Sequence, residues 1–320
     1  MKKSLAIFAV TSLIATGALA DVGRARQLGT LGGNNSTARA INNSGQIAGD
    51  ADTADGAVHA FLFERGRMRD IGTLGGDLAF GQGINDRGQV VGVSIIPSGE
   101  AHAFLWENGR MIDLGVPPGR SFSEARAINN RGTIVGESEG TAVVWDGGRI
   151  QVLDAPGTDS SIAAAINNGG VVAGWVGFPD FSTVAVIWQH GQMVELGTLG
   201  GGTFSVAEGI NDRGQVVGES TTPDGITHAF LWERGVMSDL GTITDGTFTS
   251  AHSINEPGHV VGDSSTANGD TRALLWTPRR IFDLRGVRGS EGQFAAAINN
   301  QDQIVGINFV GGFNRAVLWE

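Results

Sequence analysis

Short apolar runs alternate with glycine-rich turns along the whole chain, and one arrangement of the two recurs at a nearly fixed interval. Ile-Asn-x-x-Gly followed by a short apolar run occurs in seven copies, with an aspartate in place of the glycine in the last. Its asparagines are Asn42, Asn85, Asn129, Asn167, Asn211, Asn255 and Asn299. Neighbouring asparagines lie 38 to 44 residues apart. A repeat of this length with strand-like content is typical of a β-propeller, in which each repeat forms one blade.

One repeat, residues 79–116, shows which elements the pattern predicts. Apolar and β-branched segments predict four short strands, at residues 79–85, 89–94, 101–106 and 110–114. The turn after Asn85 suits a tight hairpin, because Asn bonds its own backbone and Gly88 accepts a positive φ. Asn108-Gly109 is a second hairpin signal. Helical periodicity is absent, so each repeat is predicted to form a four-stranded antiparallel blade.

The same third-strand positions carry large aromatic residues in every repeat, each with an alanine three residues earlier. The aromatic residues are Phe63, Trp106, Trp145, Trp188, Trp232, Trp276 and Trp319. Large side chains at a fixed place beside small ones suit packing between blades, so we interpret them as core.

The two ends of the chain complement each other. The last repeat stops after its third strand, residues 316–319, whereas residues 23–33 resemble the fourth strand of the first repeat, residues 66–76. We expect the N-terminal strand to complete the seventh blade, which would leave no exposed strand edge there. The sequence therefore predicts an all-β, closed seven-bladed propeller with four-stranded blades.

The first twenty residues have a different character. Lys2 and Lys3 precede an apolar stretch, and Ala18-Leu19-Ala20 matches a small-x-small cleavage site. This pattern predicts a secretory signal peptide at residues 1–20 and a propeller domain at residues 21–320, exported to the periplasm or the external medium. The chain has no cysteine, so its stability has to come from packing rather than from disulfides.

The charge limits the possible partners. The formal net charge is −11, and both lysines lie in the predicted signal peptide. An acidic surface repels phosphate backbones, so we expect no nucleic-acid partner. No later stretch reaches the ~20 apolar residues that a membrane-spanning helix needs, so we expect no membrane insertion. We expect a monomer.

Several strings resemble the HAF repeat family of bacterial extracellular proteins. They are His-Ala-Phe at 59–61, 102–104 and 228–230, Asp-Leu/Ile-Gly-Thr-Leu-Gly-Gly at blade junctions, and Ile-Asn-Asp-Arg-Gly-Gln-Val-Val-Gly at 84–92 and 210–218. The resemblance covers essentially all of residues 21–320 and implies an exported, propeller-like repeat protein. It implies no activity. In the other copies the histidine is replaced by Thr141, Val184, Arg272 and Arg315.

Known catalytic and metal-binding motifs are not convincingly present. Residues 136–140 match Gly-x-Ser-x-Gly, but that motif needs a strand–turn–helix setting, and Ser138 matches serines of other repeats. Residues 50–56 have the wrong spacing for a calcium loop. The histidines of the repeat, His59, His102 and His228, belong to blades one, two and five, and a ring places blade five too far from the other two for one metal site to collect all three. We therefore predict no metal site, no cofactor and no catalytic residue from motifs.

Two places remain where a ligand could bind. The connections after the second and fourth strands are long and variable, and binding residues concentrate on such loops. Trp175, Phe178 and Phe181 form the densest unusual aromatic group there. The second place is the axis, where the residue three positions before each asparagine varies: Arg39, Gln82, Arg126, Ala164, Glu208, His252 and Ala296. Channel lining is the simplest interpretation of this second set.

From these observations we predict an exported, non-catalytic propeller that binds a protein or carbohydrate partner on its variable loop face. Candidate ligand-binding residues are Trp175, Phe178, Phe181, Arg39, Gln82, Arg126, Glu208 and His252. The alternative is a hydrolase or lyase with a site at the channel mouth, built from Arg126, Glu208 and His252. The lack of any dense cluster of acids, histidines or metal ligands in the sequence favours the non-catalytic interpretation.

Overall fold

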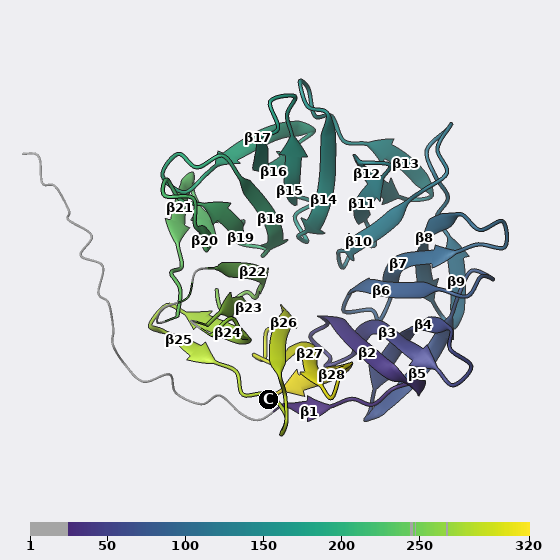
Figure 1. Cartoon of the computed structure of the whole chain (residues 1–320). Helices are drawn as coiled ribbons and strands as arrows, with labels where there is room; N and C mark the ends of the chain where they lie inside the picture. The colour runs from purple at the N-terminus through teal and green to yellow at the C-terminus, as the bar shows by residue number, and fades with distance from the viewer. Residues whose placement is uncertain (1–24, 244–245, 247, 267) are drawn as a thin grey trace, which may run out of the picture.

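The chain folds into a ring of seven antiparallel sheets of four strands each, arranged around a central opening (Figure 1). The structure is a computed structural model that describes residues 25–243, 246, 248–266 and 268–320. These residues contain strands and turns and no helix, and hence no helix of the length and apolarity needed to cross a bilayer. The predicted all-β, seven-bladed propeller is confirmed. The predicted signal peptide lies outside the described residues.

In six blades the four strands follow sequence order from the axis outward, and in the seventh the N-terminal strand is the outermost. The inner strands are β2 (Gly32–Ile41), β6 (Ala79–Ile84), β10 (Glu124–Ile128), β14 (Ser160–Ile166), β18 (Ser205–Ile210), β22 (Thr249–Ile254) and β26 (Gly292–Ile298). The second strands are β3 (Ile47–Thr53), β7 (Val90–Ile95), β11 (Ile134–Ser138), β15 (Val172–Gly177), β19 (Val216–Thr221), β23 (Val260–Ser265) and β27 (Ile304–Val310).

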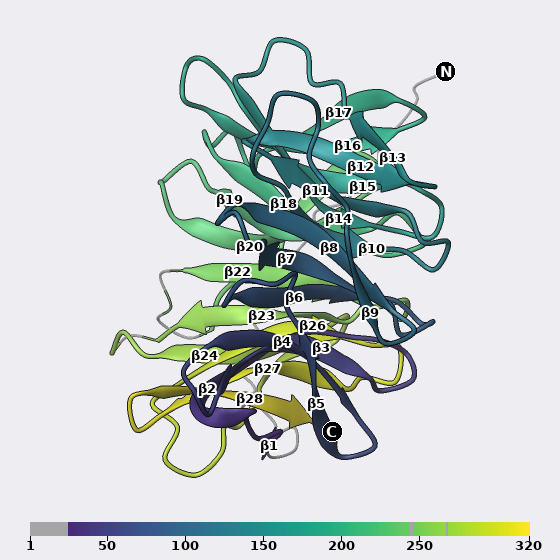
Figure 2. The ribbon, with the colours of Figure 1, turned by 90° about the vertical axis from the view of Figure 1, so that its right-hand side faces the viewer.

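The outer half of each blade follows the same plan. The third strands are β4 (Val58–Glu64), β8 (Ala101–Glu107), β12 (Thr141–Asp146), β16 (Thr183–Gln189), β20 (Thr227–Glu233), β24 (Thr271–Thr277) and β28 (Phe313–Trp319). The outermost strands are β5 (Arg67–Gly72), β9 (Arg110–Asp113), β13 (Arg149–Val152), β17 (Gln192–Gly197), β21 (Val236–Asp239) and β25 (Arg280–Asp283), with β1 (Arg26–Gln27) in the seventh blade. Seen from the side, the blades stack around the ring with their connections on two opposite faces (Figure 2).

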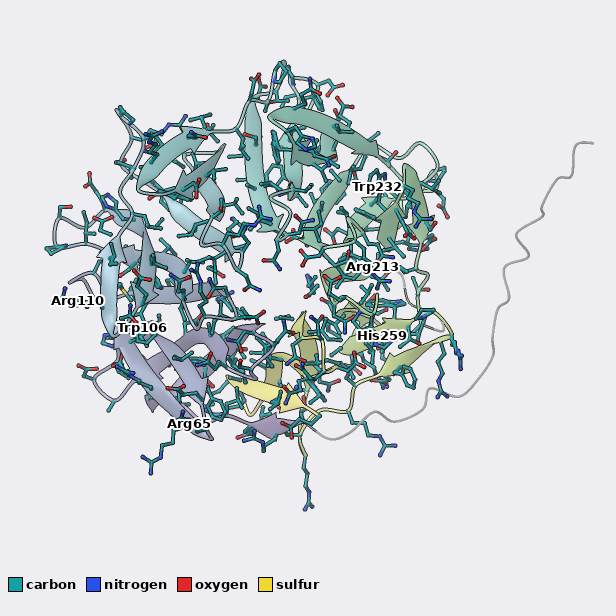
Figure 3. All side chains as sticks on the ribbon, turned by 180° about the vertical axis from the view of Figure 1, so that it is seen from behind. Arg65, Trp106, Arg110, Arg213, Trp232 and His259 are labelled. Atoms are coloured by element: carbon teal, nitrogen blue, oxygen red, sulfur yellow. The ribbon has the colours of Figure 1, made fainter. Side chains whose placement is uncertain are left out.

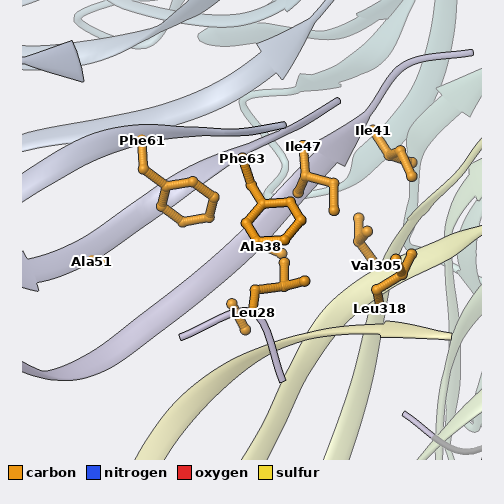
Figure 4. Packing of buried hydrophobic residues seen from close by; sticks show 10 residues of the cluster. Leu28, Ala38, Ile41, Ile47, Ala51, Phe61, Phe63, Val305 and Leu318 are labelled. Atoms are coloured by element: carbon orange, nitrogen blue, oxygen red, sulfur yellow. The ribbon is translucent and has the colours of Figure 1, made fainter. Parts of the chain in front are cut away.

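The two ends of the chain close the ring. In the antiparallel pair of β1 and β28, Arg26 lies opposite Leu318 and Gln27 opposite Val317. Figure 1 shows the purple N-terminal strand beside the yellow C-terminal one. Immediately after β1, Leu28 is 8% exposed and packs with Phe63 and Leu318 in the cluster between the first and last blades (Figure 4). The predicted completion of the last blade is confirmed.

The third-strand aromatic residues pack between neighbouring blades, as predicted. Trp106, Trp145, Trp188, Trp276 and Trp319 are buried, and Trp232 is partly buried (Figure 3). The alanines three residues before them are 0–1% exposed. A buried tryptophan beside an alanine fills the wedge between two sheets, which explains why both residue types recur.

The seven repeat asparagines form a closed hydrogen-bond circuit around the axis. Within each turn the side-chain oxygen accepts the backbone N–H four residues later, as at Asn42 and Gln46 (2.9 Å). The side-chain Nδ2 donates to the backbone carbonyl of the next asparagine round the ring, from Asn42 to Asn85 (2.9 Å) and finally from Asn299 back to Asn42 (3.1 Å). Each asparagine thus ties one turn together and joins it to the next blade.

The residue after each asparagine forms a second circuit. Its backbone N–H donates to the side-chain oxygen of its counterpart in the next blade, for example Asn43 to Asp86 at 2.8 Å. The circuit runs through Asn43, Asp86, Asn130, Asn168, Asp212, Glu256 and Asn300 and closes on Asn43. An oxygen-bearing side chain is therefore needed at this position in every copy.

The histidine of the His-Ala-Phe string also has a structural partner. His59, His102 and His228 contact Asp70, Asp113 and Asp239 on the outermost strands at 2.8, 2.9 and 2.7 Å. In the sixth blade Arg272 pairs with Asp283 in the same way. These pairs join the third strand to the outermost strand, and they lie in separate blades.

Candidate functional site

Each inner strand carries a β-bulge at the residue three positions before its asparagine. The register shifts there in all seven blades. A bulge locally re-aims a side chain, and here the bulged residue faces the axis. The seven residues are Arg39, Gln82, Arg126, Ala164, Glu208, His252 and Ala296, and all of them line one cavity of about 460 Å³. In Figure 3, side chains from the inner strands project into the central opening.

A glycine on the second strand makes each bulge possible. In all seven blades, the glycine seven residues after the asparagine faces a carbonyl of the inner strand so closely that an added Cβ would lie about 2 Å from that oxygen. For Gly218 the oxygen belongs to Val206, and the distance would be 1.9 Å. A glycine inside a strand often marks a bulge, so the sequence contained a signal for this geometry.

Carboxylates on the second strands accompany the charged axial residues. Arg39 contacts Asp50 at 2.7 Å, Arg126 contacts Glu137 at 3.0 Å, and His252 contacts Asp263 at 2.6 Å. These carboxylates, and Glu219 in the blade of Glu208, follow their axial residue by eleven positions. They were missed by sequence reasoning. Where the axial residue is uncharged, the same position holds Val93, Trp175 or Ile307.

Arg126 is held by two carboxylates of its own blade. It also contacts Glu124 at 3.3 Å, and Glu124 accepts a hydrogen bond from Gln82 of the preceding blade at 2.9 Å. Its Nε atom is buried and has no hydrogen-bond partner in the part of the chain that the structure describes. The guanidinium group is thus fixed by two carboxylates and is pre-positioned at the cavity wall.

Glu208 has an unusual environment. It lines the cavity from β18, and among the described residues it makes no hydrogen bond and no ion pair. Burial raises the pKa of its carboxyl group, although the charges of His252 and Arg126 oppose the shift. The neighbouring Glu219 also has a pKa raised by burial. Removing a carboxylate from water without a partner is costly, so such a group is rarely retained for stability alone.

His252 is the third charged group on this side of the cavity. Burial lowers its pKa, but the hydrogen bond that the imidazole donates to Asp263 and the charges of Asp263, Glu208 and Glu219 outweigh burial, so the pKa of the imidazole is raised. The ring is therefore more readily protonated than an ordinary histidine. It is positioned by Asp263, which is 7% exposed.

The remaining wall of the cavity is apolar. The small side chains of Ala164 and Ala296 leave room at the axis in the fourth and seventh blades, and Phe294, 38% exposed, and Ile307 line the cavity beside Ala296. The isoleucines before the repeat asparagines lie where this wide cavity meets a narrower one of about 180 Å³. The narrow cavity is lined by the asparagine turns, so the wide one opens toward the opposite, variable loop face.

The predicted aromatic group does not come together at this cavity. Trp175 is partly buried in β15, and Phe178 packs against the cluster between the third and fourth blades. Phe181 is 97% exposed, in the turn after β15. The predicted role of these residues in ligand binding stays a prediction.

No family model and no curated protein matches the chain, so the resemblance to the HAF repeat family stays a prediction. Solved structures do match. A puromycin-hydrolysing peptidase from Mycobacterium tuberculosis is 14% identical with a TM-score of 0.62, and 94% of this chain aligns with 54% of that one. An acylaminoacyl peptidase from Pyrococcus horikoshii is 12% identical with a TM-score of 0.62, with 91% and 52% covered.

The propeller domain of the Trilobed protease from Pyrococcus furiosus, described as having an open velcro topology, is similar over nearly its whole length. It is 11% identical with a TM-score of 0.61, and 89% of this chain and 96% of that chain are covered. The present chain spans about half the length of the two peptidases. At identities this low the likeness establishes the fold, and the chemistry has to be argued from the residues of this chain.

The prediction of a non-catalytic binding protein is wrong. Solved structures that share this ring belong to peptidases and a protease, which agrees better with the alternative, a hydrolase or lyase. The premise of the prediction also fails. A dense cluster of acids was thought to be lacking, yet the fold gathers Asp50, Glu124, Glu137, Glu208, Glu219 and Asp263 around His252 and the two arginines.

Proposed function

We propose that the protein is a hydrolase or lyase whose active site is the wide cavity at the axis. The observation that carries this proposal is the convergence of Arg126, Glu208 and His252, from three blades, on one cavity of about 460 Å³. Two of these groups have shifted pKa values that follow from burial and neighbouring charge. Titratable groups with such environments in one cleft are typical of catalytic sites.

Two of the three side chains have definite chemical roles in this proposal. His252, oriented by Asp263 and carrying a raised pKa, donates a proton to the leaving group and afterwards accepts one. Arg126, fixed by Glu124 and Glu137, stabilises negative charge that develops on the substrate. Both groups are held in place by buried or partly buried carboxylates, so little reorganisation is needed during reaction.

The test is turnover of a panel of chromogenic esters, amides and glycosides by the protein and its His252→Gln variant. We expect the variant to lose at least about 100-fold in kcat/KM, as is usual when a general acid is removed. The matched control is His228→Gln, which removes a histidine paired with Asp239 at 2.7 Å outside the cavity. Equal rates for the wild type and His252→Gln, or no turnover by the folded wild type, would contradict the proposal.

We also propose that the protein is exported and acts as residues 21–320, as the resemblance to the HAF repeat family implies. The support is the basic start, apolar stretch and small-x-small site within residues 1–20. N-terminal sequencing of the secreted protein should begin at Asp21. Because both lysines lie in the removed segment, an amine-reactive label should couple once per chain, and coupling at several amines would contradict processing.

A further inference from the structure

We propose that the substrate is cationic: an amine or guanidinium group on a compact apolar body, bound in the wide cavity with its charge at Glu208. The inference deepens the proposed function and rests on it, because it assigns the substrate class of the same site. It makes Glu208 the specificity-determining residue, because Glu208 is an acidic side chain that lines the cavity and has no part in the proposed proton transfer.

The charge balance of the site favours a cation. Three cationic side chains, Arg39, Arg126 and His252, face six carboxylates, at Asp50, Glu124, Glu137, Glu208, Glu219 and Asp263. Each cation already contacts at least one carboxylate, so its charge is balanced before a ligand binds. The excess of negative charge attracts a cationic ligand and repels an anionic one.

Glu208 is an independent indication that a ligand completes the site. It lines the cavity, it is partly buried by the surrounding strands, and it has no hydrogen bond or ion pair within the described residues. The other acids have partners: Asp50 and Asp263 in ion pairs, Glu124 and Glu137 with Arg126, and Glu219 with Ser250. A cation from the ligand would supply the partner that Glu208 lacks, and a charge-assisted hydrogen bond of this kind is strong.

The shape of the cavity indicates the rest of the ligand. Ala164, the axial residue between Arg126 and Glu208 round the ring, leaves space beside Glu208 for a small charged group. Phe294 and Ile307 supply an apolar surface in the seventh blade. A volume of about 460 Å³ lies in the range of small-molecule pockets, so the cavity suits a small molecule or the end of a chain.

The first experiment measures binding of three probes of similar shape to the mature protein at low salt: phenethylamine, phenethyl alcohol and 3-phenylpropionate. Calorimetry should give a Kd for the amine at least tenfold below that for the alcohol, with the propionate weakest. Added salt should weaken amine binding. Equal affinity for the amine and the alcohol would overturn the inference.

The second experiment assigns the charge to Glu208. Glu208→Gln should weaken amine binding at least tenfold and leave alcohol binding unchanged, whereas Glu107→Gln, which changes a glutamate outside the cavity, should alter neither. Circular dichroism checks that the variants fold. A measurement on the wild type alone provides a second readout. Amine affinity should rise with pH as Glu208 ionises, and an affinity that stays constant between pH 5 and 8 would contradict the assignment.

The two proposals fail in different ways. If the amine binds through Glu208 but His252→Gln hydrolyses or eliminates every substrate as fast as the wild type, the substrate class stands and the proposed enzyme fails. If turnover depends on His252 but neutral substrates are preferred to amine-bearing ones, the enzyme stands and the substrate class is wrong.

Discussion

Glu208 combines a cost to folding with a position that suits function. Its carboxylate is partly buried and lacks a hydrogen bond within the described residues, while Gln82, Arg39 and Arg126 in the same ring all have partners. Groups kept at the expense of stability concentrate at functional sites. The cost and the proposed role can be separated experimentally, because a neutral isostere removes the charge without removing the side-chain volume.

Glu208→Gln should therefore be more stable than the wild type at pH 8 and equally stable at pH 4. The pKa of Glu208 is raised in the folded chain from an ordinary value of 4.5, so the folded state binds this proton more tightly than the unfolded state does. The protonated carboxyl group therefore favours the folded state at low pH. This stabilisation is lost as the pH rises through the pKa that Glu208 has in the folded chain. Glutamine does not titrate, so the variant escapes this loss.

The measurement is urea denaturation of both proteins across this pH range. Other groups of the cluster titrate as well: burial raises the pKa of Glu219 and Asp50, and carboxylates raise that of His252 against burial. Because both proteins contain these groups, the difference between the two curves reports the titration of residue 208 together with its charge coupling to His252 and Glu219. A variant that is less stable than the wild type at pH 8 would show that the carboxylate has a stabilising partner.

The asparagine circuit leads to a second prediction at this scale. Asn129 Nδ2 donates to the carbonyl of Asn167 at 3.2 Å, and Asn129 is 4% exposed. In Asn129→Asp, a carboxylate oxygen would face that carbonyl, so we expect a loss of about 3 kcal/mol in the free energy of unfolding at pH 7. The loss should shrink at low pH, where the protonated acid can donate again.

The matched control is Asn108→Asp in the exposed turn after β8, where φ is +52°. Aspartate tolerates this backbone conformation, so we expect little change there at either pH. Urea denaturation at pH 7 and pH 4 compares the two variants. Equal stability of Asn129→Asp and the wild type at pH 7 would mean that the inter-blade hydrogen bond contributes nothing.

At the scale of elements, the turns between the second and third strands show how a repeat tolerates exceptions. Four blades place a glycine with positive φ at the same point of this turn: Gly56, Gly99, Gly225 and Gly269. The fourth blade has Phe181 there, with φ at +66° and a side chain that is 97% exposed. A bulky residue in this conformation is strained, and its ring gains little from burial.

Phe181→Gly should therefore stabilise the protein by about 1 kcal/mol, because relief of the strain exceeds the extra flexibility that glycine gives the unfolded chain. The reciprocal change, Gly225→Phe at φ +82°, should destabilise it by a similar amount. Urea denaturation of both variants measures the two effects. A destabilised Phe181→Gly variant would indicate that Phe181 makes contacts that hold the turn.

The strands and turns of each blade were predictable because their signals are local. The four strands predicted within residues 79–114 match β6 to β9 to within one residue at most boundaries. The bulges were not predicted, although a glycine of the second strand stands beside each one, as Gly218 does opposite Ala207. The carboxylates eleven residues after the axial residues were missed for the same reason. The register shift pairs Glu219 with Val206, two residues before Glu208, and so places both carboxylates within reach of each other's charge.

At the scale of the whole molecule, the blades are joined by contacts that only a complete ring can satisfy. Both hydrogen-bond circuits end where they begin, through Asn299 to Asn42 and through Asn300 to Asn43. Sequence alone showed the recurring residues but not their partners, since each partner is a full repeat away. The circuits and the pairing of β1 with β28 make the contacts at the closure equivalent to those at the other blade junctions.

Removal of residues 21–31 should therefore weaken the entire ring. The deletion exposes the edge of β28 and takes Leu28, 8% exposed, out of the cluster with Phe63 and Leu318. Loss of a buried leucine costs about 3 kcal/mol, so we expect a melting temperature lower by about 5–10 °C and a greater tendency to aggregate. Circular dichroism and light scattering during heating measure the two effects.

Arg26→Ala is the matched control, because it keeps the backbone pairing and removes only the contact of the guanidinium group with the Phe63 ring. Leu28→Ala should fall between the control and the deletion. If the truncated protein melts at the same temperature as the full-length one, the strand at Arg26–Gln27 does not close the ring.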